Sequence, residues 1–303
     1  MPGMDARAVF SKADDETEGG AAFRLVARDP PPTPLVFASP HSGRHYPAEM
    51  LAAAAVEPEV LRQSEDAFVD TLIAPAAAAG AALILARHGR AFMDLNRQPW
   101  ELDPTMFSDV LPDFAQGRTA RVAAGLGAIA RSADGRDIYA RKLTFAEAQT
   151  RVAGTHAPYH NALESLLTKA RAAHGMAVLI DWHSMPEAAA KTAVTPRHGK
   201  GCDMVLGDRF GASCTRKLTD LVERELEAMG YHVARNAPYA GGYTTEYYGR
   251  PANRTHALQI EISRALYLDE TTLEPTEGLA RLTADIGKLT AVLAADWPKL
   301  RPA

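Results

Sequence analysis

The sequence predicts an α/β fold: a single three-layer domain in which a mixed, mostly parallel sheet has helices on both faces. Strand-like apolar runs alternate with helix-like runs along the chain, which is the pattern of a sheet covered by helices. The 303 residues are 47% hydrophobic, which is ample for one large core. We therefore expect one domain over residues 26–303, preceded by a loosely ordered arm over residues 1–25.

Short apolar runs predict the strands, and longer runs predict the helices. The run Met176–Ile180 is apolar throughout, as expected of a strand buried on both faces. The region 97–118 is rich in Pro, Asp and Gln and predicts a long excursion over the surface. The predicted strands are 35–40, 82–88, 91–96, 176–181, 203–208, 231–236 and 256–263. The predicted helices are about 65–79, 119–133, 144–173, 213–229 and 274–296.

Composition argues against several classes of protein. The formal net charge is −4, so no basic surface favours nucleic acid or acidic lipid. The longest apolar runs are alanine-rich, broken by Pro or Gly, and too short to span a bilayer. Residues 1–20 lack the apolar core of a signal peptide, and two cysteines are too few for a disulfide framework. We expect a cytoplasmic protein that binds neither nucleic acid nor membrane; composition alone fits an enzyme and a binding protein equally well.

Four of the predicted strands carry reactive polar side chains at or near their carboxyl ends. In open α/β sheets ligands bind at that edge, so residues far apart in the sequence are expected to meet there. These residues are His41, Asp94, Asn96, Arg97, Asp181, His183 and Glu261.

His41 and His183 suggest a metal site. Each follows an apolar strand and precedes a serine. Two imidazoles and a carboxylate suit a catalytic zinc, which keeps its fourth position open. The carboxylate would come from Glu65, Asp66 or Asp70 at the start of a predicted helix; alternatively, these acids only complement the helix dipole. A serine hydrolase is disfavoured, because the sequence has no Gly-x-Ser-x-Gly motif.

A series of motifs carries a resemblance to a known family. Between about residues 35 and 270 the chain contains, in order, SPHSGRHYP, EDAFVDTL, FMDLNRQP, APYH, LIDWHSMP, VLGDRFGASC, NAPYAGGYTTEYYG and HALQIEISRALYLDE. Together these motifs resemble the N-formylglutamate amidohydrolase family. The resemblance implies a phosphorylase/hydrolase-like, zinc-exopeptidase-like fold that is distantly similar to the carboxypeptidases. It also implies metal-dependent hydrolysis of N-formyl-L-glutamate to formate and L-glutamate, a step of histidine degradation.

The resemblance also assigns the metal site. It implies that the ion, Zn²⁺ or another divalent metal, is held by His41, Asp66 and His183. Glu65 is the less favoured carboxylate. The stretch MDLNR resembles the Asp-x-Asn-Arg stretch of carboxypeptidases, which implies that Asp94 orients a ligand histidine. The carboxypeptidase pattern His-x-x-Glu fails here, because Arg44 stands at that spacing from His41.

Glu261 is the expected catalytic residue, both by the resemblance and by its chemistry. Its apolar setting in LQIEIS is expected to raise its pKa. A carboxylate near an attacking water can take its proton and pass it to the leaving amine, and zinc lowers the pKa of a bound water to about 7. The alternative is an acid on the polar face of an edge strand, since apolar residues alternate with polar ones here.

An acidic N-formyl amino acid needs cations for its carboxylates, and the planar arginine side chain binds a carboxylate through two hydrogen bonds. Arg97, together with Asn96, and Arg90 are favoured by the resemblance. Arg44, Arg87 and Arg254 are the other candidates, and surface ion pairing is the default for any single arginine.

Further residues are expected around the substrate. The glycines of NAPYAGGYTT allow a close backbone approach, and an ordinary turn is the alternative. The candidate substrate-binding residues of this stretch are Asn236, Tyr239, Gly241 and Gly242. Asp181 is expected to steady an adjacent ligand. Two other functions stay open: hydrolysis of another N-formyl or N-acyl amino acid or small peptide, and metal-dependent ligand binding without catalysis.

Overall fold

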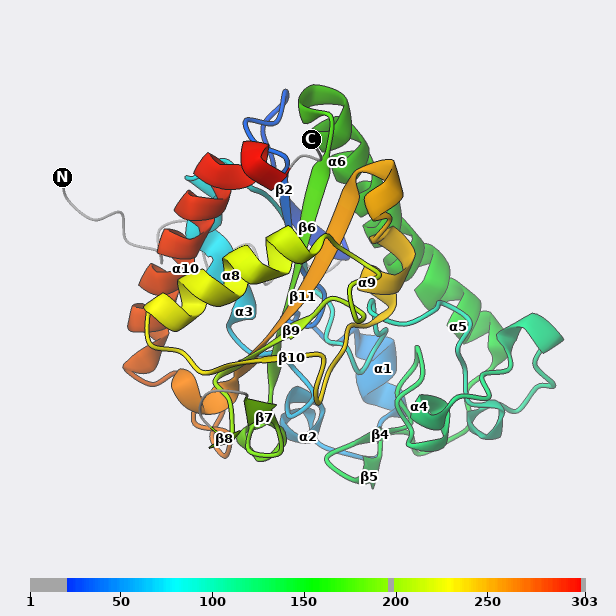
Figure 1. Cartoon of the computed structure of the whole chain (residues 1–303). Coiled ribbons are helices and arrows are strands. Elements are labelled where there is room, and N and C mark those ends of the chain that lie inside the picture. Colours follow the sequence, from blue (N-terminus) through cyan, green and yellow to red (C-terminus); the bar gives the residue numbers. More distant parts are fainter. Residues whose placement is uncertain (1–20, 196–198, 301–303) are drawn as a thin grey trace.

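A seven-stranded sheet forms the centre of the molecule, as the computed structural model of residues 21–195 and 199–300 shows (Figure 1). The strand order is β1-β3-β2-β6-β11-β9-β10. The pairs β1–β3 and β9–β11 are antiparallel, and the other neighbouring pairs are parallel. The strands are β1 (Phe23–Val26), β2 (Leu35–Ser39), β3 (Ala82–Ala86), β6 (Ala177–Met185), β9 (Met204–Gly207), β10 (Val233–Arg235) and β11 (Thr255–Ser263). The predicted mixed, mostly parallel sheet is confirmed.

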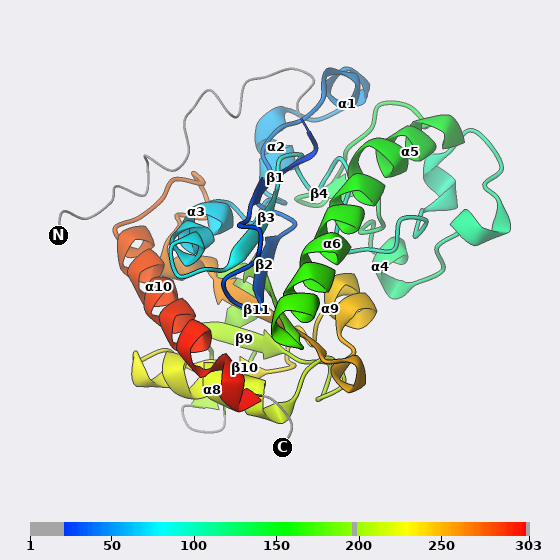
Figure 2. The same ribbon diagram turned by 90° about the horizontal axis from the view of Figure 1, so that it is seen from above.

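Helices cover both faces of the sheet, which gives the predicted three layers (Figure 2). One face packs against α3 (Val69–Ile73), α8 (Arg216–Ala228) and α10 (Gly278–Asp296). The other face packs against α6 (Ala157–His174) and α9 (Tyr243–Tyr248). None of the described helices is both long and apolar enough to cross a membrane.

Shorter elements surround this framework, and several of them enclose a separate apolar cluster beside the carboxyl edge of the sheet. The short helices are α1 (Ala48–Ala53), α2 (Pro58–Arg62), α4 (Ala120–Ala123), α5 (Phe145–Arg151) and α7 (Glu187–Ala190). The short strands are β4 (Ser132–Ala133), β5 (Arg136–Asp137), β7 (Val194–Thr195) and β8 (Gly199–Lys200). The main 3-10 turns are η3 (Ala74–Ala77), η4 (Pro104–Met106), η5 (Asp113–Ala115), η7 (Pro251–Asn253), η8 (Arg264–Leu266) and η9 (Trp297–Leu300).

The two longest strands, β6 and β11, lie side by side in the middle of the sheet. Every one of their nine residues is buried. They run parallel, with His183 of β6 directly opposite Glu261 of β11. Trp182 points to the opposite face and packs against Phe37 of β2, with ring centroids 5.6 Å apart. The apolar half of β6 therefore anchors the polar half, which carries side chains to the carboxyl edge.

Three sequence predictions differ from the structure. The predicted strand 91–96 forms turns and has no neighbour in the sheet. Ala91, Phe92 and Met93 join the separate apolar cluster, and Leu95 joins the cluster between the sheet and α6. Of the predicted helix 119–133, only α4 forms, since Gly125 and Gly127 follow within one turn. Part of the predicted arm 1–25 is the edge strand β1, which pairs with β3; residues 1–20 lie outside the described residues.

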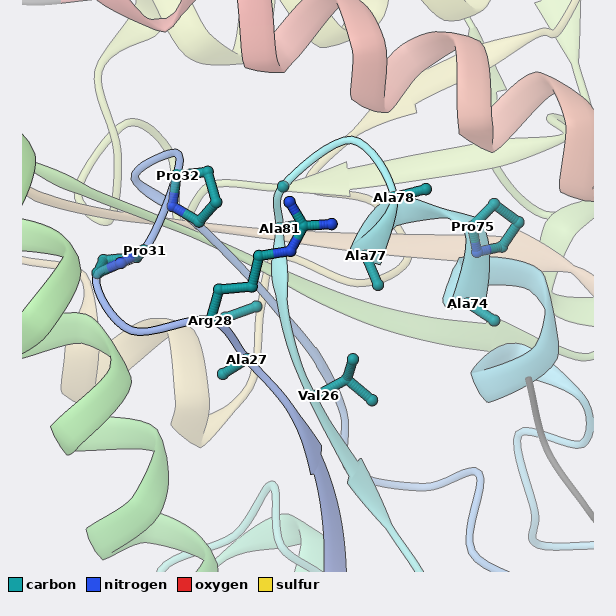
Figure 3. Close-up of a pocket in the computed structure, with 12 residues that line it drawn as sticks. Val26, Ala27, Arg28, Pro31, Pro32, Ala74, Pro75, Ala77, Ala78 and Ala81 are labelled. Atoms are coloured by element: carbon teal, nitrogen blue, oxygen red, sulfur yellow. The ribbon is translucent and has the colours of Figure 1, made fainter.

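A cavity of about 530 Å³ lies at the amino ends of β2 and β3, away from the carboxyl edge (Figure 3). Its lining is mostly alanine and proline, and Arg28 is the one charged side chain among the described residues that line it. It offers no group of polar side chains for chemistry. The polar residues that the sequence singled out lie at the other edge.

Candidate metal centre

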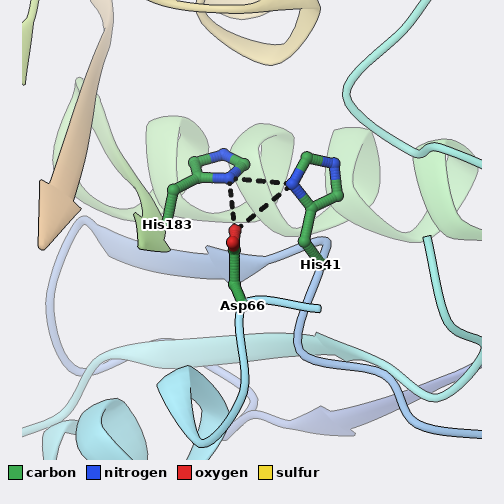
Figure 4. A group of neighbouring side chains, drawn as sticks. All are labelled: His41, Asp66 and His183. Carbon is green, nitrogen blue, oxygen red and sulfur yellow. Dashed lines mark hydrogen bonds and ion pairs between the residues drawn. The ribbon is translucent and has the colours of Figure 1, made fainter. Parts of the chain in front are cut away.

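Three side chains from distant parts of the chain converge at the carboxyl edge of the sheet (Figure 4). His41 follows β2, Asp66 precedes α3, and His183 lies in β6. The Nδ1 atoms of the two histidines are 3.1 Å apart, and the Asp66 Oδ2 atom lies 3.3 Å from His41 Nδ1 and 3.0 Å from His183 Nδ1. All three residues are at most 2% exposed.

The far side of each histidine is held by a carboxylate. His41 Nε2 lies 2.6 Å from Asp94 Oδ1, and His183 Nε2 lies 3.0 Å from Asp181 Oδ2. A proton on His41 Nε2 would be donated to Asp94, whereas Asp181 lies beside His183 Nε2 as an ion pair and its oxygens accept no hydrogen bond within the described residues. Both Nδ1 atoms are directed at the centre. This carboxylate–histidine arrangement is the usual support of metal-binding histidines.

The geometry and charge of this group fit a divalent ion. Zinc bonds of about 2.0–2.1 Å at tetrahedral angles place neighbouring donor atoms roughly 3.3 Å apart, close to the observed spacings. Burial by itself would raise the pKa of Asp66, but hydrogen bonds from His183 and His41 outweigh it and hold that pKa well below its usual range. Burial would lower the pKa of His183, but the Asp181 and Asp66 carboxylates raise it well above its usual range. The acids therefore need a positive charge at the centre, which a metal ion can supply in place of a proton.

Glu261 lies beside this group on β11. It is 7% exposed, and burial, together with the negative charges of Asp66 and Asp181, raises its pKa to about 7. The His183 and Arg90 charges oppose this shift. The Gln259 side chain donates a hydrogen bond from Nε2 to Glu261 Oε1 at 2.7 Å. A carboxyl group with a pKa near neutrality can both accept and donate a proton at physiological pH.

The model of the N-formylglutamate amidohydrolase family matches residues 33–268. The chain belongs to this family. The matched segment contains every residue of the centre described above, so the family resemblance of the motifs is confirmed.

Several relatives in this family are known. An N-formylglutamate amidohydrolase from Ralstonia eutropha has a crystal structure that is 40% identical, with a TM-score of 0.86 over 92% of this chain and 99% of that one. The N-formylglutamate deformylase of Pseudomonas aeruginosa is 29% identical over 78% of this chain and 83% of its own length. The N-formylglutamate deformylase of Pseudomonas putida is 29% identical over 86% of this chain and 92% of its own length. A gene product of Agrobacterium tumefaciens shares the fold at 18% identity, with a TM-score of 0.64.

In this N-formylglutamate amidohydrolase family member, two arginines lie close to the centre. Arg90 Nη2 donates to Asp94 Oδ2 at 2.8 Å. Burial would lower the pKa of Arg90, but the Asp94 charge outweighs it and raises that pKa. Arg97 is 9% exposed and donates to the backbone carbonyls of Asn96 and Leu126. Burial lowers the pKa of Arg97, so both guanidinium groups lie in a largely enclosed region.

The glycine-rich loop lies against the centre. The Gly242 N–H donates to Gln259 Oε1 at 2.8 Å, and an added Cβ at Gly242 would overlap the Asn96 side chain. The Asn96 amide nitrogen lies 3.1 Å from His183 Nε2. Tyr239 is 37% exposed, and burial followed by the Glu261 charge raises its pKa. Gly241 has a φ of 119°, which a glycine adopts without strain.

Other candidates are engaged elsewhere. The Asn236 side chain bonds to Asp208, within the loop that follows β9. Glu65 accepts a hydrogen bond from Tyr46 at 2.8 Å and is not part of the donor triangle. Arg254 lies at the amino end of β11, on the opposite edge of the sheet.

Sequence reasoning missed two supports of Asp66. Arg264 Nη2 donates to the Glu65 carbonyl at 2.7 Å and lies 3.4 Å from Asp66 Oδ1. The Ser184 hydroxyl donates to the same Asp66 oxygen at 3.2 Å. Ser184 directly follows His183, and Arg264 directly follows β11, so both stand at the sheet edge that the sequence singled out. Their places next to these residues are the feature of the sequence that indicates a role at the centre.

Proposed function

We propose that this protein hydrolyses the formyl amide of N-formyl-L-glutamate with the help of one divalent metal ion, preferably zinc, held by His41, Asp66 and His183. The observation that carries the proposal is the triangle of donor atoms 3.0–3.3 Å apart, in which each imidazole is backed by a carboxylate. The names of the relatives supply the substrate. The products are formate and L-glutamate.

An ion bound there would polarise the formyl carbonyl and lower the pKa of a water. Glu261 supplies the proton transfer. Because its pKa is raised to about 7, it accepts a proton from the attacking water and donates it to the nitrogen as the C–N bond breaks. Gln259 fixes the orientation of the Glu261 carboxylate through its hydrogen bond. Asp94 and Asp181 keep both histidines turned with Nδ1 toward the centre.

The two carboxylates of the substrate require cations that are already in place. Arg90 and Arg97 are the proposed partners, because Arg97 is buried and Arg90 partly buried, and both lie within 4.0 Å of the Asp94 carboxylate beside the centre. Asn96 completes this group through its amide. Tyr239, Gly241 and Gly242 are proposed to close over the substrate, and Asn236 to hold the start of this loop. We further propose that the reaction serves histidine degradation in the cytoplasm, as the family resemblance implies.

The test is an assay of amine release by the metal-loaded protein with N-formyl-L-glutamate, N-acetyl-L-glutamate and N-formyl-L-leucine. We expect the first to be the best substrate. A higher kcat/KM for either of the other two would move the assignment to another N-acyl or N-formyl amino acid. No release from any of them would favour a binding protein without catalysis.

The variant Glu261→Gln separates catalysis from scaffolding. It keeps the size of the side chain but cannot accept a proton, so kcat should fall by roughly 10²–10⁴ while the metal content stays unchanged. Glu65→Gln is the matched control, because Glu65 is also a buried carboxyl group but is bonded to Tyr46. Metal loss in Glu261→Gln would make Glu261 a ligand, and normal turnover would remove it from the reaction.

A further inference from the structure

A second cavity lies at the amino ends of β6 and β11, at the opposite edge of the sheet from the metal centre. Its volume is about 740 Å³. The end of α6, the start of α8, the segment around Arg254 and the last 3-10 turn, η9, enclose it. This size falls in the range of small-molecule sites.

The described residues that line this cavity include cations but no acid. Lys217 and Arg254 have no carboxylate partner in the described part of the chain, and Arg254 Nη1 lies beside Gly175. Arg216 makes only a long ion pair of 3.6 Å with Asp220. In a chain with a net charge of −4, this is a local excess of positive charge.

The start of α8 adds to this charge. The helix has 13 residues, and its N-cap residue Thr215 makes no side-chain hydrogen bond to the first turn. The Thr215 hydroxyl oxygen is buried and has no partner among the described residues. An uncapped helix start presents N–H groups and a partial positive charge, both of which favour an anion.

His256 is an independent sign of a missing ligand. It lines the cavity and is 2% exposed, and its Nδ1 accepts the Thr215 N–H at 3.3 Å. Burial lowers the pKa of His256, so the ring is neutral and carries its proton on Nε2. Within residues 21–195 and 199–300, this Nε2–H has no acceptor. The His256 ring lines the cavity, so its Nε2–H can donate a hydrogen bond to a bound molecule there.

We propose that this cavity binds the phosphate group of a small phosphorylated molecule whose remaining part is uncharged. Two unpaired cations, a helix start and the His256 N–H match a group of charge −1.5 to −2 better than a single carboxylate. Ala173, Met176 and Leu300 form an apolar wall that would cover the uncharged part. The proposal does not depend on the proposed function, since the metal centre lies at the other edge of the sheet.

The test is calorimetric titration of the metal-loaded protein with ribose 5-phosphate at constant ionic strength. We expect one molecule bound per chain, with inorganic phosphate binding more weakly and ribose not at all. Lys217→Met and Arg254→Asn should each weaken binding roughly tenfold or more, because each removes a charged contact. Asparagine suits the left-handed backbone of Arg254, where φ is 59°.

Lys142→Met is the control, because it removes the same charge from an exposed position before α5. It should bind ribose 5-phosphate as the parent protein does, and none of the three substitutions should change turnover without phosphate. Unchanged binding in Lys217→Met and Arg254→Asn would overturn the proposal. So would displacement by L-glutamate, which would place the anion at the metal centre, or inorganic phosphate binding as tightly as the ester.

Discussion

Both histidines of the centre direct the same ring atom, Nδ1, towards Asp66, because a buried acid lies beside Nε2 of each ring. Asp94 and Asp181 occupy the Nε2 side of His41 and His183, so both Nδ1 atoms face Asp66. In the metal-free protein this leaves His183 between two carboxylates, which explains its raised pKa. The proton on His183 Nδ1 therefore occupies the position in which a divalent ion would bind.

This competition predicts that metal binding releases protons. The raised pKa keeps His183 protonated at neutral pH, and a metal must displace that proton, so affinity should fall as the pH is lowered. Zinc titrations at pH 7 in buffers of different ionisation enthalpy should show release of about one proton or more per ion. His183→Ala should lose most of the zinc affinity. Binding enthalpies that do not depend on the buffer would contradict this exchange.

Arg97 gives a prediction about specificity. If its buried guanidinium binds a substrate carboxylate, Arg97→Ala should lower kcat/KM for N-formyl-L-glutamate. The loss should correspond to about 2–5 kcal/mol of transition-state stabilisation, and the loss for a neutral N-formyl amino acid should be much smaller. Arg118→Ala is the control, since Arg118 is exposed. Equal losses for acidic and neutral substrates would show that Arg97 only supports the fold through the Asn96 and Leu126 carbonyls.

At the scale of the elements, the sequence best predicts the strands that are buried along their whole length. The strands β2, β3, β6 and β11 are buried on both faces, and the sequence predicts each within a few residues, from apolar runs in the first three and from apolar residues that alternate with polar ones in β11. The edge strand β1 was missed, because its pairing with β3 is a tertiary contact that a four-residue segment does not reveal. The segment 91–96 has the composition of a strand but no partner in the sheet.

The site was readable where side chains stand at the ends of strands. His41, His183 and Glu261 could be picked out because reactive groups interrupt apolar runs. Gln259 and Arg264 were not, because their contacts depend on how β11 and the glycine-rich loop lie in space. Alternation along β11 does place Gln259 on the same face as Glu261, which was an unused clue.

The glycine-rich loop yields a prediction of its own. Gly242→Ala should push the Asn96 side chain away from His183 and lower kcat/KM by roughly 10², since an ångström of displacement at a site has that order of effect. The φ of Gly242, −101°, suits any residue, so the variant tests the steric contact alone. In an Asn96→Ala background the same change should cost little, and an equal loss there would reject the explanation.

Gly287→Ala serves as the control for that experiment. Gly287 lies inside α10 with free space around it, so alanine should stabilise the protein by about 0.5–1 kcal/mol and leave activity unchanged.

At the scale of the whole molecule, a buried histidine joins two helices on one face of the sheet to the loop at its carboxyl edge. His160 of α6 lies 2.9 Å from both the Tyr248 hydroxyl of α9 and the Leu95 carbonyl. Burial, followed by the His156 charge, lowers the pKa of His160 to about 3. The neutral ring thus connects a helix of one face to the loop that carries Asp94 and Asn96.

This contact predicts loss of stability in acid. The unfolded chain takes up a proton at His160 near its ordinary pKa of about 6.5, whereas the folded protein does not until about pH 3. Stability from this residue is therefore full above pH 6.5 and falls by up to about 1.4 kcal/mol per pH unit below it. His160→Gln should flatten the pH dependence of the unfolding free energy by that amount. Identical slopes would show that His160 titrates normally.

The three donors of the metal centre lie far apart along the chain, with His183 separated from Asp66 by 117 residues and from His41 by 142. An ion that all three hold would act as a cross-link between distant segments, which the unfolded chain cannot keep. At a free concentration of a hundred times its dissociation constant, the ion would stabilise the fold by about 2.7 kcal/mol. The supply of metal in the cell would then set how long the protein survives proteolysis as well as how fast it works, and starvation for metal would remove the enzyme itself.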